Sequence, residues 1–166
     1  MTKVIGSMKP VIFLRIASVL TLVQAAGHTI GGVFGKPDPG AQQAAVTAMK
    51  TITFPVFGQT RSFWDFHIGF GLAMTLSMVI EAIVFWQLGS LAKGDAAKLR
   101  PIFWTFFLGY LLIAANAYAF FFPAPVIFTL LIACCLGMTI LTANPKVAAV
   151  TRAELGAENG NAAAAR

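Results

Sequence analysis

Residues 63–88 read FWDFHIGFGLAMTLSMVIEAIVFWQL. A helix needs about 20 mostly apolar residues to cross the hydrocarbon core of a membrane, and this stretch is long enough. Its charged residues are Asp65, near the start, and Glu81, toward the end. The stretch therefore predicts a transmembrane helix, and it indicates a helical membrane protein.

The composition of the whole chain agrees with this prediction. Of its 166 residues, 58% are hydrophobic and 11% are charged, whereas a soluble domain carries about 25% charged residues. The net charge of +6 is not arranged as a basic stripe interleaved with aromatic residues, so no nucleic acid is expected as a partner. Membrane lipids are expected to surround most of the chain.

Three more apolar runs complete the predicted fold. Besides 63–88, the predicted spans are residues 11–34, 101–122 and 125–142. Pro101 and Pro125 stand in the first turn of a helix, where proline is tolerated. We therefore expect an all-α membrane protein whose four transmembrane helices form an antiparallel bundle.

The chain is expected to contain a single domain, residues 1–145, which holds all four predicted spans. Residues 146–166 are rich in alanine, glutamate and asparagine, and we expect a cytoplasmic, largely disordered tail there. Cys134 and Cys135 are adjacent in an apolar run. This spacing favours two small apolar side chains over a redox or metal pair.

The first span has an alternative interpretation as a signal peptide. Basic residues precede an apolar core, and small residues follow at Ala25 and Ala26. Because the apolar stretch continues through Ile30 to Phe34, we expect an uncleaved span, with Arg15 reaching toward the headgroups.

The basic residues predict the orientation. Four spans bring nine of the twelve lysines and arginines to one side, namely Lys3, Lys9, Arg15, Lys93, Lys98, Arg100, Lys146, Arg152 and Arg166. Cytoplasmic segments of membrane proteins carry the excess of lysine and arginine. Both termini are therefore expected in the cytoplasm, and the long loop 35–62 on the other side.

The long loop 35–62 is the longest connection, and long ordered loops are often functional. Asp38 followed by Pro39 is typical of a helix start, which predicts a short helix from Pro39 to about Thr51. That helix could lie on the membrane surface. Residues 54–58, Phe-Pro-Val-Phe-Gly, are expected to end it.

Polar side chains inside the predicted spans are the candidate functional groups, because such residues are costly in lipid. His28, His67 and Asn116 come from three different spans and fall at a similar depth near the non-cytoplasmic end. Asp65 and Arg61 lie at the rim of this layer. We therefore expect an outer-leaflet pocket with the loop 35–62 above it.

The residue types suggest roles in this pocket. His28 and His67 would be the acid and base, because an imidazole exchanges protons near neutral pH. Asp65 would orient a histidine, and Asn116 would hold the polar end of a ligand. The remaining candidate ligand-binding residues are Gln24, Glu81, Arg61 and Trp64.

Each candidate also has a purely structural interpretation. The histidines could bond each other, backbone carbonyls or Asn116, and so fix the helix register. Asp65 could pair with Arg61 or cap a helix. Glu81 could accept structural hydrogen bonds instead of handling protons.

Three functions follow from these alternatives. The first is a protein that binds a hydrophobic small molecule, such as a lipid, quinone or isoprenoid, with or without acid–base isomerase activity. The second is a bis-histidine haem protein, or a metal site of two histidines and Asp65. The third is an assembly subunit that forms a homo-oligomer or joins a larger membrane complex through the small-residue ridge of Gly69, Ala73 and Ser77. The sequence identifies no cofactor.

Two segments, residues 27–32 (GHTIGG) and 61–71 (RSFWDFHIGFG), together with FFPAP at 121–125, resemble a family of small four-helix bacterial inner-membrane proteins without a characterised function. The resemblance covers roughly residues 8–145. It implies the fold and a bacterial plasma membrane, and it marks His28, Asp65 and His67 as the family's landmarks. It implies no activity.

Overall fold

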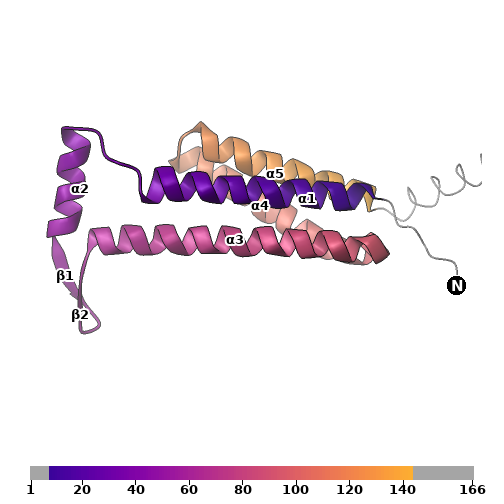
Figure 1. The fold of residues 1–166 in the computed structure, drawn as a ribbon, viewed down its shortest axis with the longest axis horizontal. Helices are drawn as coiled ribbons and strands as arrows, with labels where there is room; N and C mark the ends of the chain where they lie inside the picture. The colour runs from indigo at the N-terminus through magenta and orange to yellow at the C-terminus, as the bar shows by residue number, and fades with distance from the viewer. Residues whose placement is uncertain (1–7, 144–166) are drawn as a thin grey trace, which may run out of the picture. The chain divides into compact units, whose positions relative to one another are not determined.

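The computed structural model describes residues 8–143, and the predicted tail 146–166 lies outside them. The described residues are mostly helical and divide into two compact units. We call residues 8–20 with 82–143 the core unit and Thr21–Glu81 the loop unit. Figure 1 shows the elements of both units in chain order.

The first helical segment changes its hydrogen-bonding pattern along its length. α1 covers Lys9–Gly27, and a π-helical segment, η1, continues from His28 to Val33. The amide of Phe34 donates to the carbonyl oxygen of Thr29 at 3.0 Å, a bond that spans five residues. Such widened turns are rare and occur frequently at functional sites. The predicted span 11–34 did not anticipate this change.

The loop after η1 is ordered. α2 covers Ala41–Thr51, so the predicted helix exists but begins after Gly40 and not at Pro39. Residues 54–58 were expected only to end that helix, but they belong to a hairpin. Its strands β1 (Thr53–Val56) and β2 (Gln59–Ser62) are antiparallel, with Val56 paired to Gln59.

The second half of the chain contains three helices joined by short turns. They are α3 (Phe63–Asp95), α4 (Arg100–Phe120) and α5 (Pro123–Thr142). α3 runs seven residues beyond the predicted end at Leu88, because its last two turns include the more polar residues 89–95. A 3-10 turn, η2 (Ala96–Leu99), follows it.

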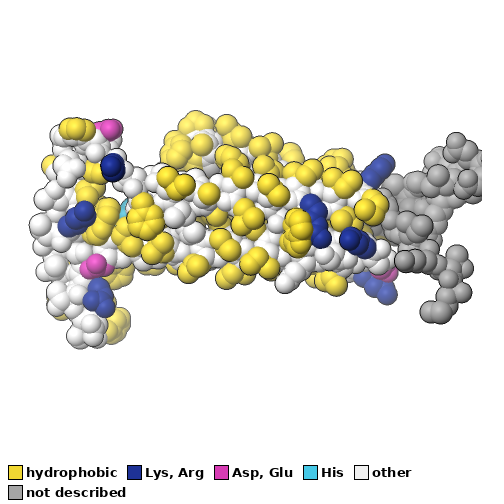
Figure 2. All heavy atoms as spheres, in the orientation of Figure 1, with side chains coloured by type: hydrophobic (Ala, Val, Ile, Leu, Met, Phe, Trp, Pro, Cys, Tyr) yellow, Lys and Arg dark blue, Asp and Glu magenta, His cyan; other side chains and the backbone are white. Residues whose placement is uncertain are grey.

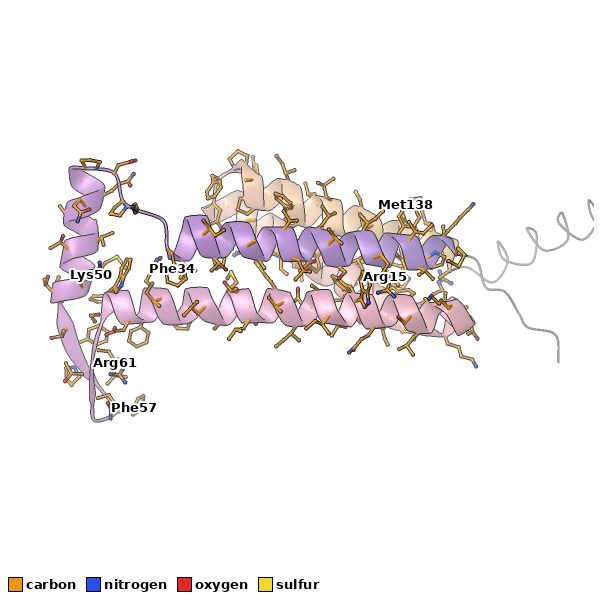
Figure 3. The ribbon with its side chains drawn as sticks, in the orientation of Figure 1. Arg15, Phe34, Lys50, Phe57, Arg61 and Met138 are labelled. Atoms are coloured by element: carbon orange, nitrogen blue, oxygen red, sulfur yellow. The ribbon has the colours of Figure 1, made fainter. Side chains whose placement is uncertain are left out.

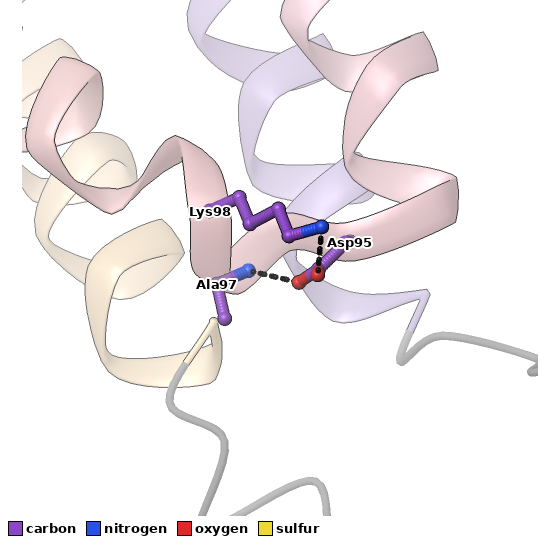
Figure 4. Close-up of polar contacts among 3 residues, drawn as sticks. All are labelled: Asp95, Ala97 and Lys98. Carbon is purple, nitrogen blue, oxygen red and sulfur yellow. Dashed lines mark hydrogen bonds and ion pairs between the residues drawn. The ribbon is translucent and has the colours of Figure 1, made fainter.

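The side chain of Asp95 organises the turn between α3 and α4 (Figure 4). Its Oδ1 accepts a hydrogen bond from the amide of Ala97 at 3.2 Å, and its Oδ2 lies 3.7 Å from Nζ of Lys98. Because both side chains are exposed, the ion pair adds little. The bond from the Ala97 amide to the Asp95 side chain caps the start of η2.

Three helical stretches of the described residues are long and apolar enough to cross a membrane. They are Lys9–Val33, Phe63–Phe120 and Pro123–Thr142. The second comprises 58 residues, counts α3, η2 and α4 as one stretch, and includes the bend at Asp95. This confirms a helical protein able to span a membrane.

The core unit packs side chains from α1, α3, α4 and α5 into one cluster. Leu14, Phe85, Phe103, Ile132 and Leu136 are all fully buried there. The ring of Phe85 lies 5.0 Å from the ring of Phe106, in an edge-to-face arrangement that aromatic pairs favour. In contrast, large apolar side chains cover the outside of α3, as the hydrophobic spheres of Figure 2 show.

Arg15 was expected to reach toward the headgroups, and in the core unit it packs against α3. Its guanidinium carbon lies 3.4 Å from the centroid of the Trp86 ring, and Nη2 donates to Oγ of Ser90 at 2.9 Å. A Cβ at Gly89 would lie 3.4 Å from Nε of Arg15. The absence of a side chain at Gly89 thus leaves room for Arg15 between α1 and α3 (Figure 3).

Candidate functional site

The loop unit brings the π-helical segment against the first turns of α3. Nε2 of His28 lies 3.1 Å from the carbonyl oxygen of Gly71. A carbonyl only accepts, so Nε2 carries the hydrogen and donates it. In the neutral ring Nδ1 is then left as the acceptor. His28 thus has a structural bond at Nε2 and, in its neutral form, an acceptor at Nδ1.

Two threonines extend this contact. The hydroxyl of Thr29 lies 2.8 Å from the hydroxyl of Thr75, and it also donates to the carbonyl oxygen of Ala25 at 2.7 Å. The hydroxyl of Thr75 in turn lies 3.1 Å from the oxygen of Gly71, the acceptor of His28. The structure therefore joins α1, η1 and α3 by a short polar network around one carbonyl.

The absence of a side chain at Gly71 allows this approach. A Cβ there would lie 2.7 Å from Cγ2 of Val33, which is only 2% exposed. Val33 has no long flexible end that could move aside. α3 is therefore packed tightly against the π-helical segment at Gly71.

A hollow of about 350 Å³ opens beside the network, within the loop unit. We call it the π-turn hollow. Its lining comes from η1, the segment after it, α2 and α3, namely Gly31, Gly32, Gly35, Lys36, Pro37, Gln42, Ala45, Val46, Trp64 and His67. The hollow thus combines three glycines, one cation, an indole and an imidazole.

Two glycines of the lining, Gly35 and Gly32, stand where a side chain would be crowded. A Cβ at Gly35 would overlap the carbonyl oxygen of Gly31, so the chain can leave η1 in this way only with glycine at position 35. A Cβ at Gly32 would lie 3.4 Å from Nδ1 of His28. His28 does not line the hollow itself, but its acceptor nitrogen lies directly behind Gly32.

His67 and Trp64 form the α3 side of the hollow. Their rings have centroids 5.0 Å apart, and Nζ of Lys50 lies 4.6 Å from the Trp64 centroid. Lys50 of α2 thus contacts the ring of Trp64, and the ring of Trp64 contacts that of His67. Trp64 was predicted as a ligand-binding residue and His67 as catalytic, and both lie in the same wall.

Asp65 has the contacts of a helix cap, which is one of the alternatives that the sequence left open. Its Oδ2 accepts from the amide of Ser62 at 2.7 Å and from the hydroxyl of Ser62 at 2.9 Å. The hydroxyl of Ser62 accepts from the amide of Asp65 at 3.2 Å. This reciprocal pair is a capping box at the start of α3. Arg61 is exposed, and its Nη1 donates to the carbonyl oxygen of Thr60 at 3.1 Å.

The remaining predicted site residues lie elsewhere. Gln24 on α1 and Glu81 on α3 belong to the loop unit but do not line the hollow, and Glu81 has interactions of its own. Asn116 is exposed on α4, in the core unit. The predicted meeting of Asn116 with the two histidines stays a prediction.

Metal and haem binding find no prepared site in the described part of the chain. Among residues 8–143, no three histidine, cysteine, aspartate or glutamate side chains gather as metal ligands. Haem ligation by both histidines would have to use Nδ1 of His28, since Nε2 donates to Gly71.

Most of the lining was not predicted from the sequence. The glycines of 27–32 and the long loop were noted there, but nothing in their spacing showed that Lys36, Gln42 and Val46 reach the same hollow. That knowledge required the fold of the loop.

Comparison with known proteins adds no family to this description. The chain matches no known protein-family model, no curated protein and no solved structure at a significant level.

Proposed function

We propose that this chain is an integral membrane protein that binds a hydrophobic small molecule by its polar end in the π-turn hollow. The ligand class is a lipid, quinone or isoprenoid-like molecule. The observation that carries the proposal is that His67, Trp64 and Lys36 line one hollow, with Nδ1 of His28 behind its wall at Gly32.

The arrangement of the lining suits an amphiphilic ligand. Trp64 offers an apolar face, and Lys36 and His67 offer a charge and hydrogen bonds to a carbonyl, hydroxyl or phosphate group. The exposed apolar side chains of Phe66 and Phe70 continue along α3 from this level. A ligand with its head in the hollow could therefore extend its tail along a lipid-facing helix.

The proposed membrane topology has four crossings and both termini in the cytoplasm of a bacterium. The packing of Phe85 against Phe106 and Tyr110 supports it, since α4 must run back along α3 to make both contacts. α4 and α5 are separated only by Phe121 and Phe122. In such an antiparallel bundle the hollow faces the non-cytoplasmic side.

The same side chains could perform acid–base chemistry. An isomerisation takes a proton from one atom of a substrate and returns one to another. His67, which lines the hollow, would be one of the two proton-transfer groups, and Nδ1 of His28 would be the other for a substrate atom that passes Gly32. Asp65 is left out of this scheme, because its contacts are those of a cap.

Ligand binding can be tested with the full-length protein in lipid nanodiscs. Small molecules that copurify are extracted and identified by mass spectrometry, and the assay is repeated with His67→Ala. Gln43→Ala is the matched control, because Gln43 is exposed on α2 but does not line the hollow. We expect His67→Ala to lose the bound species and the control to retain it.

Asn116→Ala makes the test sharper. The π-turn hollow is lined without Asn116, so this variant should keep the ligand. If Asn116→Ala loses the ligand while His67→Ala keeps it, the site lies elsewhere and the proposal is wrong.

An assembly role is a second candidate, and one observation favours it. Gly69, Ala73 and Ser77 form an exposed ridge on α3, and a Cβ at Gly69 would meet no described atom of its unit within 4 Å. Such ridges allow close helix packing. Replacing Ala73 by leucine should then shift the mass of the detergent-solubilised particle, and it should leave ligand copurification unchanged.

A further inference from the structure

Phe57 occupies an unusual position at the tip of the β1–β2 hairpin. It and Gly58 form the two-residue turn between Val56 and Gln59, with φ angles of 46° and 79°. A turn with positive φ at both central residues favours asparagine, aspartate or glycine. Phenylalanine is strained there, and its side chain is 104% exposed. Nothing in the fold of the hairpin explains an aromatic ring at this place.

Aromatic packing fixes the hairpin on α3. The ring of Phe54 lies 4.8 Å from that of Phe63 and is stacked 5.8 Å from that of Phe66. The hairpin and α2 consequently lie across the N-terminal end of α3 (Figure 1). The face of the hairpin that carries Phe54 is therefore the face that packs on α3.

Arg61 lies on that same face. Phe54 pairs directly with Arg61, and directly opposed residues of an antiparallel pair project to the same side. Since Phe54 packs on α3, the side of the hairpin that holds Arg61 is the one turned toward the length of α3. Figure 3 shows the side chains of Phe57 and Arg61 on this side, and Figure 2 shows basic and hydrophobic spheres next to each other there.

We propose that the β1–β2 hairpin is a membrane anchor whose partner is the phospholipid layer around α3. The ring of Phe57 enters the outer part of the acyl-chain region, next to the headgroups, and the guanidinium of Arg61 binds lipid phosphate. Segments that lie in a membrane interface combine apolar side chains such as phenylalanine with lysine or arginine, and arginine binds phosphate through two parallel hydrogen bonds. The anchor would hold the loop, and with it α2, over the π-turn hollow.

The position of the hairpin in the chain supports lipid as the partner. β2 ends at Ser62, and α3 starts at Phe63, so the hairpin lies directly at the head of a helix able to cross a membrane. Phe63 and Phe70 expose apolar rings on α3 just below it. The inference goes beyond ligand binding, but it rests on the proposed crossing of α3.

The test uses a photoreactive phenylalanine, p-benzoylphenylalanine, which keeps the aromatic ring. It is introduced at Phe57, at Thr60 and at Ile80 in full-length protein, which is reconstituted in phosphatidylcholine–phosphatidylglycerol vesicles and irradiated. Thr60 is the matched control, because it pairs with Pro55 and projects to the opposite face. Ile80 is 61% exposed on α3 and reports whether that helix lies in lipid.

We expect lipid adducts in the mass spectra at positions 57 and 80 and none at position 60. Arg61→Gln should lower the adduct yield at position 57 and leave position 80 unchanged, whereas Arg61→Lys should restore part of it. Adducts at 80 without adducts at 57 would overturn the anchor and leave the crossing intact. If position 57 instead links to a protein in native membranes and to no lipid, the partner is a protein and the proposal fails. No adduct at either position would reject both the crossing and the anchor, while loss of the copurified ligand is measured separately.

Discussion

The imidazole of His28 donates from Nε2 to the carbonyl oxygen of Gly71, 3.1 Å away and 43 residues later in the chain. This bond joins the π-helical segment to α3 and, through the hydroxyl of Thr75 at the same carbonyl, to a wider polar network. It also leaves Nδ1 as the acceptor behind the wall of the hollow. One residue thus has a structural atom and a candidate functional atom.

The two atoms of His28 can be separated by substitution. His28→Gln retains a donor near the position of Nε2 and lacks the acceptor nitrogen Nδ1. We expect His28→Gln to unfold thermally close to the unchanged protein and to lose ligand. His28→Ala should lose about 1 kcal/mol of stability besides, the usual contribution of such a bond. Circular dichroism in detergent measures the first effect. A His28→Gln variant that keeps its ligand would deny Nδ1 any part in binding.

The close approach at Gly71 predicts a sharp contrast with Gly69. Gly71→Ala puts a methyl group 2.7 Å from Cγ2 of Val33, and the overpacking should cost about 1–3 kcal/mol. Gly69→Ala meets nothing within 4 Å and should be neutral or stabilising by up to about 1 kcal/mol, because alanine favours helix. Unfolding curves of the two variants in the same detergent provide the measurement. Equal melting temperatures would contradict the packing at Gly71.

The capping box at Ser62 and Asp65 predicts a stability effect without a functional one. Ser62→Ala removes the hydroxyl that donates to Oδ2 of Asp65 and accepts from the amide of Asp65. The variant should lose about 1 kcal/mol of stability at the start of α3. Asp65→Asn keeps an acceptor oxygen and should lose less. Both variants should still copurify with ligand, as checked by mass spectrometry. Loss of turnover or ligand in Asp65→Asn, at unchanged stability, would return Asp65 to the candidate catalytic residues.

Arg15 predicts a stability effect in the core unit. Arg15→Ala removes the contact with Trp86 and the bond to Ser90, and we expect a loss of about 1–2 kcal/mol. Arg15→Lys keeps the charge but not the planar stacking, so its stability should lie between that of Arg15→Ala and that of the unchanged protein. Thermal unfolding followed by tryptophan fluorescence reports both variants. Should Arg15→Ala melt like the unchanged protein, the contact contributes nothing to folding.

The strain at Phe57 predicts that the hairpin is not optimised for its own stability. Phe57→Asn introduces a residue that tolerates positive φ, and in detergent micelles the variant should gain about 1 kcal/mol. In vesicles this gain should shrink, because the contact of the ring with lipid is lost. Comparing melting temperatures in the two media checks the expectation. A gain of the same size in both would argue against a role of the ring in lipid.

Much of the secondary structure follows from local composition. The apolar runs predicted the helices near residues 11–34, 63–88, 101–122 and 125–142, and Pro101 and Pro125 lie in first turns as expected. The predicted helix of the loop begins two residues late, because Gly40 and not Asp38 precedes it. The hairpin was missed because its strands, four residues each, are too short for an alternating pattern to stand out.

The sequence by itself determined that this is a helical protein able to cross a membrane, because the length and apolarity of a span are properties of contiguous residues. It also pointed to His28 and His67, because polar groups in an apolar run are conspicuous. Only the tertiary structure decided that Nε2 of His28 is committed to Gly71, that Asp65 caps a helix, and that Lys36 joins Trp64 and His67 in one hollow. Those facts depend on which distant segments meet and on the direction of each side chain, and neither is encoded in the spacing of residues along one helix.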